Sequence, residues 1–245
     1  MKKNVTPYAE SSATKKKQVT QMFDTISGEY DFLNRIISLG IDIQWRNRVV
    51  KMASEKPISA ALDIATGTGD LALALTETSA KKIIGLDISP GMLALGKEKV
   101  AKNKLSDRIE MVIGDSEALV YEEAFFDLVT VAFGVRNFEN LEKGLGEIYR
   151  VLKPGGRILV LETSVPSRFP FKQFNSFYTG WLMPRMARLL SKDKSAYTYL
   201  AESAAHFPFG NEFNNILSKI GFIKVADHPQ TFGVASIYRG TKPTS

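Results

Sequence analysis

The sequence predicts an α/β protein built on a mostly parallel sheet of seven strands, with an antiparallel hairpin at its C-terminal end. From residue 58 onward, short apolar runs alternate with helical patterns, as in a parallel sheet that has helices on both faces. A glycine-containing loop follows the first apolar run, and a helical pattern follows the loop. No helical pattern separates the last two apolar runs, so these two strands pair antiparallel.

The short apolar runs predict the strands. The helices between them are predicted from residues that typically begin or end a helix. The expected strands are residues 60–65, 82–86, 109–113, 126–132, 157–161, 222–226 and 235–239. Ser89 and Pro90 are typical of a helix N-cap and of the first helical position. A helix over 142–152 stops at a tight turn over 153–156, which returns the chain to the sheet. Another helix covers 212–220 and ends at Gly221.

The length of 245 residues suits one sizeable core, and we expect a single domain over residues 1–245. Residues 1–55 form a helical N-terminal extension ahead of the first strand. Within this extension, residues 15–54 read as three helices, with breaks near residues 27–28 and 39–40. The alternating pattern starts only afterwards, so the extension is an addition to the sheet core.

Residues 168–209 form an insertion between the fifth strand and the last helix. The insertion holds 10 of the chain's 25 aromatic residues, more than double its share by length. An aromatic-rich insertion in this position suits a helical lid over an apolar substrate. The alternative is a satellite core packed on the domain, because apolar helical faces usually serve packing.

The composition excludes several classes of protein. Hydrophobic residues make up 44% of the chain and charged residues 24%, as in ordinary globular proteins. No apolar run approaches the roughly 18 residues of a membrane-spanning helix. The chain has no cysteine, which excludes disulfides, thiolate metal sites and a cysteine nucleophile. We expect no metal centre and a cytoplasmic location.

A formal net charge of +6 favours anionic surroundings, either nucleic acid or an acidic membrane surface. Residues 1–17 contain five lysines but no apolar core, so they read as a frayed tail and not as a secretory signal. Elsewhere the basic residues are scattered, which also suits a simple surplus of solvated lysines. Because no basic segment is concentrated enough to form a groove, we expect no nucleic-acid partner.

The loop after the first strand is typical of a site for a nucleotide cofactor. Gly67 and Gly69, with Thr68 between them, allow the backbone to approach a ligand closely. With Ala72 they match the loose G-x-G-x-x-A fingerprint, which suits either NAD or S-adenosylmethionine. Asp63 lies four residues before Gly67, where an acidic residue of methyltransferases orders the loop and the methionine part of the cofactor. This residue and the terminal hairpin favour S-adenosylmethionine.

Further polar residues follow the second and third strands. Asp87 lies at the end of the second strand, where a carboxylate can hold both hydroxyls of a ribose. Asp115 and Ser116 follow the third strand, at the position that commonly meets an adenine amino group. Each of these residues also suits ordinary turn or capping roles. Their joint placement at the carboxyl ends of successive strands favours a cofactor site.

Four further stretches of the sequence carry recognisable motifs. The most specific are Tyr-Asp-Phe-Leu-Asn at residues 30–34, which continues to Trp45-Arg46, and Phe-Gly-Val-Arg-Asn at residues 133–137. The other two are residues 150–164 and 197–203. Through these motifs the sequence resembles the C-methyltransferases of ubiquinone and menaquinone biosynthesis over residues 18–242. The resemblance implies the class I, Rossmann-like methyltransferase fold and S-adenosylmethionine as methyl donor.

The resemblance also implies the reaction, in which a methyl group is transferred to a ring carbon of demethylmenaquinol to give menaquinol. The equivalent step of ubiquinone biosynthesis, or both steps, is the alternative. For stabilising the phenolate form of the substrate we favour Arg136, with Asn137 beside it. The alternative for Arg136 is an ion pair that holds its loop. Tyr30, Asp31 and Tyr199 are weaker candidates for catalysis.

Two features limit what can be carried over from the family. Many members have a histidine where this chain has Asp42, so a histidine's role there cannot be transferred. Asp42 could accept a proton in its place or cap the following helix. The two histidines of the chain, His206 and His228, match no family motif, and we expect them on the surface or in loops.

The partners follow from the resemblance. A prenylated quinol lies in the bilayer, so the protein has to reach the inner face of the membrane as a peripheral protein. We expect transient, salt-sensitive association through the lysine-rich N-terminus and the aromatic insertion. The sequence leaves a homo-oligomer open. It also leaves three other functions open: an NAD-dependent oxidoreductase, a nucleic-acid methyltransferase and a cofactor-binding scaffold without activity.

Overall fold

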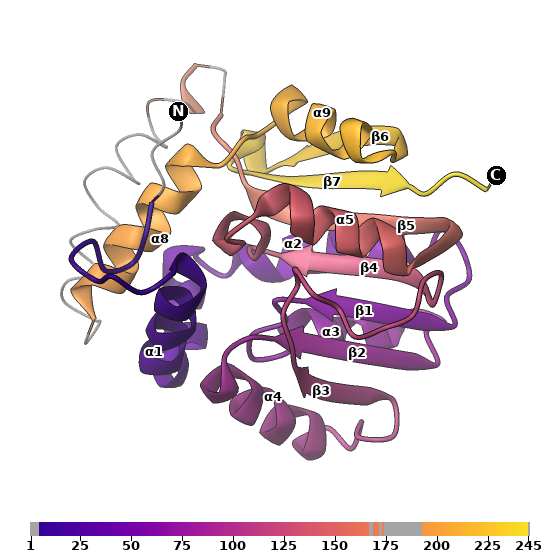
Figure 1. Ribbon diagram of the computed structural model, residues 1–245, viewed down its shortest axis with the longest axis horizontal. Coiled ribbons are helices and arrows are strands. Elements are labelled where there is room, and N and C mark those ends of the chain that lie inside the picture. The colour runs from indigo at the N-terminus through magenta and orange to yellow at the C-terminus, as the bar shows by residue number, and fades with distance from the viewer. Residues whose placement is uncertain (1–4, 167–168, 172, 174–192, 245) are drawn as a thin grey trace.

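The computed structural model describes residues 5–166, 169–171, 173 and 193–244 (Figure 1). Half of the aromatic insertion (residues 168, 172 and 174–192) lies outside these residues, and so do two of the N-terminal lysines, Lys2 and Lys3.

The predicted sheet of seven strands is confirmed, with the order β3-β2-β1-β4-β5-β7-β6 (Figure 1). Its strands are β1 (Ala60–Ile64), β2 (Lys82–Asp87), β3 (Ile109–Ile113), β4 (Phe126–Ala132), β5 (Leu152–Thr163), β6 (Ile223–Gln230) and β7 (Ala235–Thr241). The first five strands are parallel, and β7 lies antiparallel between β5 and β6. The carboxyl ends of the five parallel strands therefore share one edge of the sheet.

Helices cover both faces of the sheet and that edge. They are α1 (Lys15–Ile37), α2 (Ile41–Ala53), α3 (Asp70–Ala74), α4 (Pro90–Lys102), α5 (Leu141–Val151), α8 (Lys194–His206) and α9 (Asn211–Ile220), with short 3₁₀ turns η1 (Leu75–Glu77), η2 (Val135–Asn137) and η4 (Thr231–Gly233). One apolar core joins α2, α3 and α4 to one face of the sheet, and a second joins α5 and α9 to the other. Among the described residues, no helix has an apolar stretch that could cross a bilayer.

The end signals of the helices act as the sequence predicts. The Ser89 hydroxyl accepts a hydrogen bond from the amide of Met92 at 3.2 Å, and Pro90 opens α4. Helix α9 ends at Gly221, whose φ of 116° is a conformation that side chains disfavour. These caps satisfy backbone groups at helix ends and fix where each helix meets the sheet.

Strand β5 differs from its prediction, because it begins at Leu152 and already contains the expected tight turn. Its register against β4 shifts there: Leu152 pairs with Phe126, whereas Arg157 pairs with Leu128. The extra residues bulge out of the ladder with Gly155 at a φ of 76°. The Gly155 amide donates to the Lys242 carbonyl at 2.9 Å, so the bulge is held by the chain after β7.

The prediction of three N-terminal helices is wrong, because α1 continues through the expected break at residues 27–28. One side of α1 is buried without interruption, through Met22, Ile26 and Leu33, against α4 and α8. This packing outweighs the weak local preference of Gly28 to end a helix. The break near residues 39–40 is confirmed, with Gly40 at a φ of 76°.

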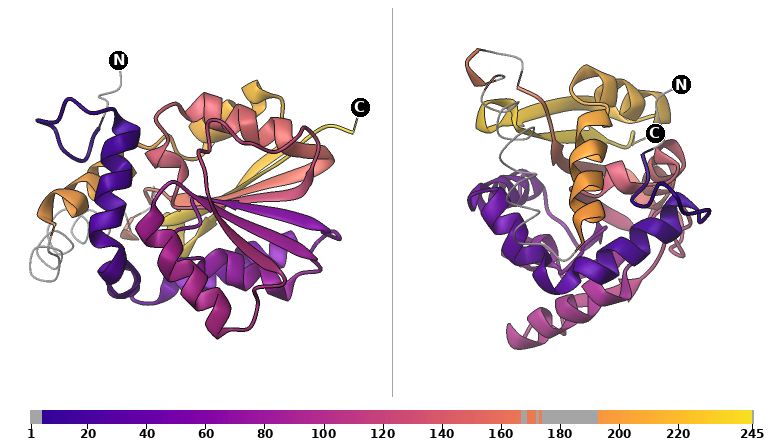
Figure 2. Two further views of the ribbon diagram at one scale, coloured as in Figure 1. Left: turned by 60° about the horizontal axis from the view of Figure 1, so that its bottom comes forward. Right: turned by 90° about the vertical axis from the view of Figure 1, so that its left-hand side faces the viewer.

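The prediction of a frayed N-terminal tail is also wrong for residues 5–17. The buried side chain of Gln18 accepts a hydrogen bond from the Tyr8 amide at 2.8 Å, and the Tyr8 hydroxyl donates to Asp193 at 2.8 Å. Lys15 and Lys16 belong to the first turn of α1. Figure 2 shows α1 and α8 lying across the edge where the parallel strands end, so this part of the chain covers the site described below.

The aromatic core under α9 gives a test of the packing. Replacing Phe213 with alanine is expected to lower the free energy of unfolding by about 3 to 5 kcal/mol, because its fully buried ring packs edge-on against Tyr238. Phe209 is 40% exposed, and Phe209→Ala is the matched control, with an expected loss of less than about 1 kcal/mol. Urea denaturation measures both losses. Equal losses would contradict this arrangement of the core.

Candidate active site

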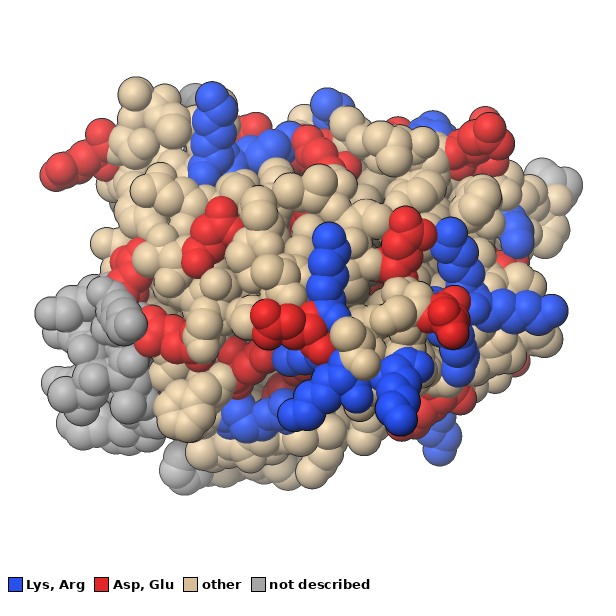
Figure 3. All heavy atoms as spheres, turned by 90° about the horizontal axis from the view of Figure 1, so that it is seen from below, with Lys and Arg blue, Asp and Glu red and all other residues tan. Residues whose placement is uncertain are grey.

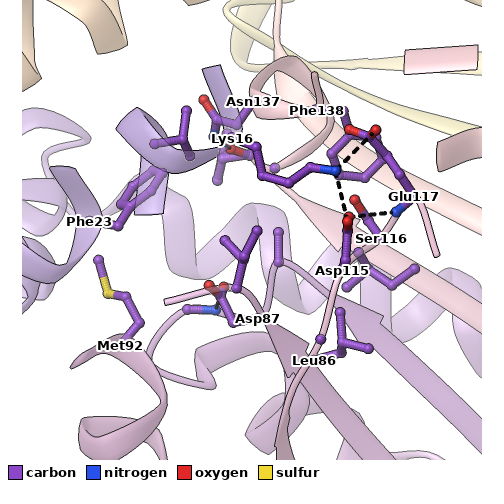
Figure 4. Close-up of a pocket in the computed structure, with 18 of the residues that line it drawn as sticks. Lys16, Phe23, Leu86, Asp87, Met92, Asp115, Ser116, Glu117, Asn137 and Phe138 are labelled. Atoms are coloured by element: carbon purple, nitrogen blue, oxygen red, sulfur yellow. Dashed lines mark hydrogen bonds and ion pairs between the residues drawn. The ribbon is translucent and has the colours of Figure 1, made fainter. Parts of the chain in front are cut away.

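A pocket opens at the carboxyl ends of the parallel strands (Figure 4). Its floor comes from β1, β2 and the loop after β3, and α1 forms one wall with Lys16, Phe23 and Tyr30. The predicted site residues that line it are Gly67, Asp87, Asp115, Ser116, Asn137 and Tyr30. Three segments that are distant in the sequence therefore meet around one cavity.

Asp87 fixes the glycine loop at the floor of the pocket. Its carboxylate accepts hydrogen bonds from the amides of Gly67 at 2.8 Å and Ser89 at 2.9 Å. Burial raises the pKa of Asp87 above its usual value, and these amide bonds oppose the shift. Each carboxylate oxygen has a second lone pair, so the side chain can still accept two hydroxyl hydrogen bonds from a ribose.

Asp63 lies beneath the loop and does not line the pocket. It accepts hydrogen bonds from the hydroxyls of Thr66 and Thr130, both at 2.6 Å. Burial raises its pKa to about 6, against the effect of these two hydrogen bonds. Asp63 thereby joins β1, β4 and the glycine loop.

The glycine loop is tied to α1 and α4 by charged side chains. Gly67 and Gly69 have φ values of 58° and 83°, which explains the residue type at both positions. The Thr68 hydroxyl donates to Asp31 at 2.6 Å and accepts from Lys99 at 2.9 Å. Lys99 also pairs with Asp31, at 2.6 Å. The network places Asp31 on the glycine loop.

Asp115 forms an ion pair with Lys16, a residue that belongs to no motif. The Lys16 ammonium contacts Asp115 at 2.7 Å and Glu117 at 3.3 Å, as Figure 4 shows. Although burial acts to lower it, these two carboxylates hold the pKa of Lys16 above its usual value. The neighbouring Lys15 donates to the carbonyls of Arg136 and Phe138 at 3.0 and 2.9 Å. The first turn of α1 is therefore bound to the loops after β3 and β4 through its two lysine side chains.

Arg136 forms a buried ion pair with Glu162, at the end of β5. The side chain of Arg136 is 9% exposed and that of Glu162 is fully buried. Tyr199 of α8 donates a hydrogen bond to the side-chain oxygen of Asn137 at 3.1 Å. Burial raises the pKa of Tyr199 to about 12, so its hydroxyl is protonated at neutral pH. The structure thus brings Arg136, Asn137 and Tyr199 together, with Glu162 as an additional member.

Tyr30 lies in the wall of the pocket, within the electrostatic reach of Arg136 and Asp87. Burial raises the pKa of Tyr30 above its usual value, and the positive charges of Arg136 and Arg46 oppose this shift. Tyr30 therefore lies between the cofactor pocket and the Arg136 cluster, whereas Asp31 faces the glycine loop.

The structure assigns Asp42 neither of its expected roles. Its buried carboxylate accepts a hydrogen bond from the Ser38 hydroxyl at 2.7 Å and forms a close ion pair with Arg46. Although burial raises it, the hydrogen bonds of Ser38 and Arg46 hold the pKa of Asp42 below its usual value. A carboxylate held in this way is a weak base, and the N-cap of α2 is Gly40.

The expectation for the histidines is confirmed for His206 only. His206 is exposed at the end of α8. His228 belongs to strand β6, and its Nε2 is buried without a hydrogen-bonding partner among the described residues. Among these residues, no cluster of His, Asp and Glu could hold a metal ion.

Sequence reasoning missed four residues of this site: Lys15, Lys16, Lys99 and Glu162. The lysines carry no motif and find their partners only through the placement of α1 and α4. Glu162 lies in a stretch that resembles the family, and it comes directly after the strand predicted over residues 157–161. Its position at a strand's carboxyl end is the one signal that could have selected it.

The pocket fits S-adenosylmethionine in its chemistry. Apolar side chains such as Leu86, Ile88 and Met92 lie beside its carboxylates. Asp87 suits the ribose, and Asp115 suits an adenine amino group. The positive φ of Gly67 and the open space at its Cα leave room for a ligand against the backbone.

Solved structures share this fold at low sequence identity. A SAM-dependent methyltransferase from Thermotoga maritima is 18% identical with a TM-score of 0.63, covering 91% of this chain and 99% of that one. The phosphoethanolamine N-methyltransferase 2 of Haemonchus contortus, solved in complex with S-adenosyl-L-methionine, is 19% identical with a TM-score of 0.58, covering 87% and 59%. The fold is therefore that of the S-adenosylmethionine-dependent methyltransferases.

The chain belongs to the ubiE/COQ5 methyltransferase family, whose model matches residues 11–242. The demethylmenaquinone methyltransferase of Bacteroides fragilis is 44% identical over 97% of both chains. The ubiquinone/menaquinone biosynthesis C-methyltransferase UbiE of Geotalea daltonii is 43% identical over 93% of this chain and 97% of its own. The family resemblance inferred from the motifs is confirmed.

Replacing Asp87 with alanine tests the cofactor site. The change removes the acceptor for two ribose hydroxyls and is expected to weaken S-adenosylmethionine binding by about 2 to 4 kcal/mol, or roughly 30- to 1,000-fold. Isothermal titration calorimetry measures the affinity. Asp127→Ala is the matched control, because Asp127 also accepts two backbone amides but lies at the amino end of β4. Unchanged affinity in Asp87→Ala would place the cofactor elsewhere.

Proposed function

We propose that this methyltransferase transfers a methyl group from S-adenosylmethionine to a ring carbon of demethylmenaquinol, giving menaquinol. The observation that carries the proposal is the match to relatives of this named activity over almost the whole chain. The name of the Geotalea daltonii relative supports the ubiquinone precursor as a second substrate. A prenylated quinol is the substrate class in both cases.

Aromatic carbon is a poor nucleophile, and the protein has to overcome this. Loss of a proton from a neighbouring hydroxyl pushes negative charge onto the ring carbon, which then attacks the methyl group of the sulfonium in line. The protein supplies alignment, excludes water and stabilises the phenolate. A guanidinium in a largely buried site suits the last task, because its charge is poorly screened there.

In this proposal the residues divide between two neighbouring regions. Asp63, Thr68 and Gly69 shape the glycine loop, while Gly67, Asp87, Asp115 and Ser116 contact the cofactor in the pocket. Arg136 and Asn137 face the quinol, with Tyr30 between the two regions. Asp31 acts through the loop and not on the substrate, since its carboxylate is engaged by Thr68 and Lys99. Residues 1–245 act as one domain.

The other functions that the sequence left open have less support. The family match favours a methyltransferase over an NAD-dependent oxidoreductase or an inactive scaffold. On the face shown in Figure 3, Lys and Arg side chains lie among Asp and Glu side chains. Some of these charges are paired; Lys82 contacts Glu110 at 3.1 Å, for example. A mixed surface of this kind does not favour a nucleic-acid substrate.

Association with the inner face of the membrane is part of the proposal. The residues that would contact lipid differ from those expected from the sequence. Lys15 and Lys16 are engaged within the protein, so they do not support binding to lipid. Exposed aromatic side chains support it instead: Phe32 is 62%, Phe169 81% and Phe232 69% exposed. Phe32 belongs to α1 and Phe232 to η4, after β6.

Methylation of a reduced quinone tests the function and the role of Arg136. Purified protein with S-adenosylmethionine and demethylmenaquinol in detergent is expected to give a product heavier by one methylene, detected by mass spectrometry. Arg136→Lys keeps a positive charge beside Glu162 but removes the planar guanidinium, and kcat is expected to fall roughly 10- to 100-fold. Arg239→Lys, at an exposed ion pair with Glu55, is the control. The proposed function would be refuted if the protein methylated neither demethylmenaquinol nor the reduced ubiquinone precursor.

Sedimentation with lipid vesicles tests the membrane proposal. Binding to anionic vesicles is expected at low salt and should fall as salt is raised, because the net charge of +6 still attracts the protein to an anionic surface. Phe232→Ser should weaken binding about three- to tenfold, because an exposed ring is lost from the lipid contact. Phe125→Ser is the matched control, since Phe125 is 43% exposed but precedes β4 at the opposite edge of the sheet. Equal binding by the two variants would contradict these anchors.

A further inference from the structure

The ion pair of Arg136 and Glu162 is incomplete. The Glu162 Oε1 atom accepts from Arg136 and also from the Thr163 amide at 2.8 Å and the Thr163 hydroxyl at 3.2 Å. The other carboxylate oxygen, Oε2, and the Nε of Arg136 are both buried without a hydrogen-bonding partner among the described residues. Buried polar atoms are nearly always paired, and leaving charged groups unpaired is costly.

These two atoms have complementary hydrogen-bonding character. Arg136 Nε is a donor, and Glu162 Oε2 is an acceptor. A phenolic hydroxyl both donates and accepts one hydrogen bond, so a single such group can satisfy both atoms. Hydroquinone hydroxyls therefore match what this ion pair lacks.

The pair also lies beside the cofactor pocket. Gly134 and Asn137 line the pocket on either side of Arg136 in the chain. Ala132 lines it too, and its partner in the sheet is Leu161, the residue before Glu162. A ring held at the pair is thus next to the wall of the methyl donor's pocket.

We propose that Glu162 is the catalytic base of the methyl transfer, and that one hydroquinone hydroxyl bridges Arg136 Nε and Glu162 Oε2. The inference rests on the proposed function. The residue assigned to accept the proton is therefore Glu162 and not Asp42.

The proton and electron balance of the step is simple. Glu162 takes the hydroxyl proton, and the electron pair left on oxygen is delocalised to the neighbouring ring carbon. That carbon forms a bond to the methyl group while the carbon–sulfur bond breaks, and the sulfur keeps its electron pair. The ring carbon then releases its hydrogen to water as a proton, the ring becomes aromatic again, and the oxygen recovers the proton from Glu162.

Arg136 makes the proton transfer feasible in a buried site. Before the step the negative charge next to Arg136 is on Glu162, and afterwards it is on the phenolate. The number of buried charges does not change, so desolvation opposes the transfer much less than it opposes the creation of a new ion pair. The titratable groups that face Glu162 are Arg136, Tyr199 of α8 and Tyr238 of β7. Burial raises the pKa of both tyrosines to about 12, so they stay protonated throughout.

The test compares Glu162→Gln with the wild-type protein in a methylation assay across pH. The amide keeps the shape of the side chain but cannot take a proton, so kcat is expected to fall at least 100-fold near neutral pH. The Michaelis constant for S-adenosylmethionine should stay within about threefold. Activity of the variant should rise tenfold per pH unit, as the quinol ionises without help, whereas the wild-type rate levels off. Glu147→Gln, at the ion pair with Arg150 on α5, is the matched control.

Three results would overturn the assignment of Glu162. These are activity of Glu162→Gln within tenfold of wild type, a pH profile parallel to that of wild type, and loss of cofactor affinity equal to the loss of activity. If Glu162→Gln does not fold, Glu162→Asp is measured in its place. Its rate is expected to be at least tenfold lower than that of the wild type, with the same pH profile. An unchanged rate overturns the proposal. If the wild-type protein methylates no quinol, the proposed function is refuted. The wild-type measurement therefore distinguishes failure of the function from failure of the Glu162 assignment.

Discussion

The hydrogen bond from the Gly67 amide to the Asp87 carboxylate is the contact on which the cofactor pocket depends. It joins the loop after β1 to the end of β2, and the Ser89 amide on the other carboxylate oxygen extends the link to α4. Asp63 supports the same loop from below through the hydroxyls of Thr66 and Thr130. Two buried carboxylates thus position the loop before any ligand arrives, and such preorganisation lowers the cost of binding.

Charged side chains then attach the N-terminal helix to this frame. Lys15 and Lys16 hold the first turn of α1 on the loops after β4 and β3, and Lys99 holds Asp31 of α1 on the glycine loop. The wall of the pocket that contains Phe23 and Tyr30 is therefore fixed from both sides. Partly buried ion pairs of this kind set the orientation of an element more than they add to stability.

The two regions of the site differ in how completely their polar groups are paired. Around the glycine loop, the carboxylates of Asp63, Asp87 and Asp31 all accept hydrogen bonds within the protein. At the Arg136 cluster, Nε of the arginine and one oxygen of Glu162 remain without partners among the described residues. A satisfied network suits a rigid binding loop, whereas unpaired buried atoms suit a place where substrate completes the contacts.

The sequence by itself determined the sheet, its terminal hairpin and the glycine loop. Strand periodicity, helix caps at Ser89 and Gly221 and the glycine spacing are local signals, because each depends on residues a few positions apart. The family motifs added Arg136 and Asn137 in the same way. Boundaries were less secure where packing competes with local preference, as in α1, which continues through Gly28.

Only the tertiary structure decided which charges meet. Lys16 and Asp115 are 99 positions apart in the chain, and Lys15 is 121 positions from Arg136. No local pattern marks such partners, so the lysines that read as a frayed tail are part of the site. The same holds for Glu162, which becomes the partner of Arg136 because β4 and β5 lie side by side and end at the same edge. Sequence fixes what is local, and the chemistry of this site depends on contacts that the folded sheet creates.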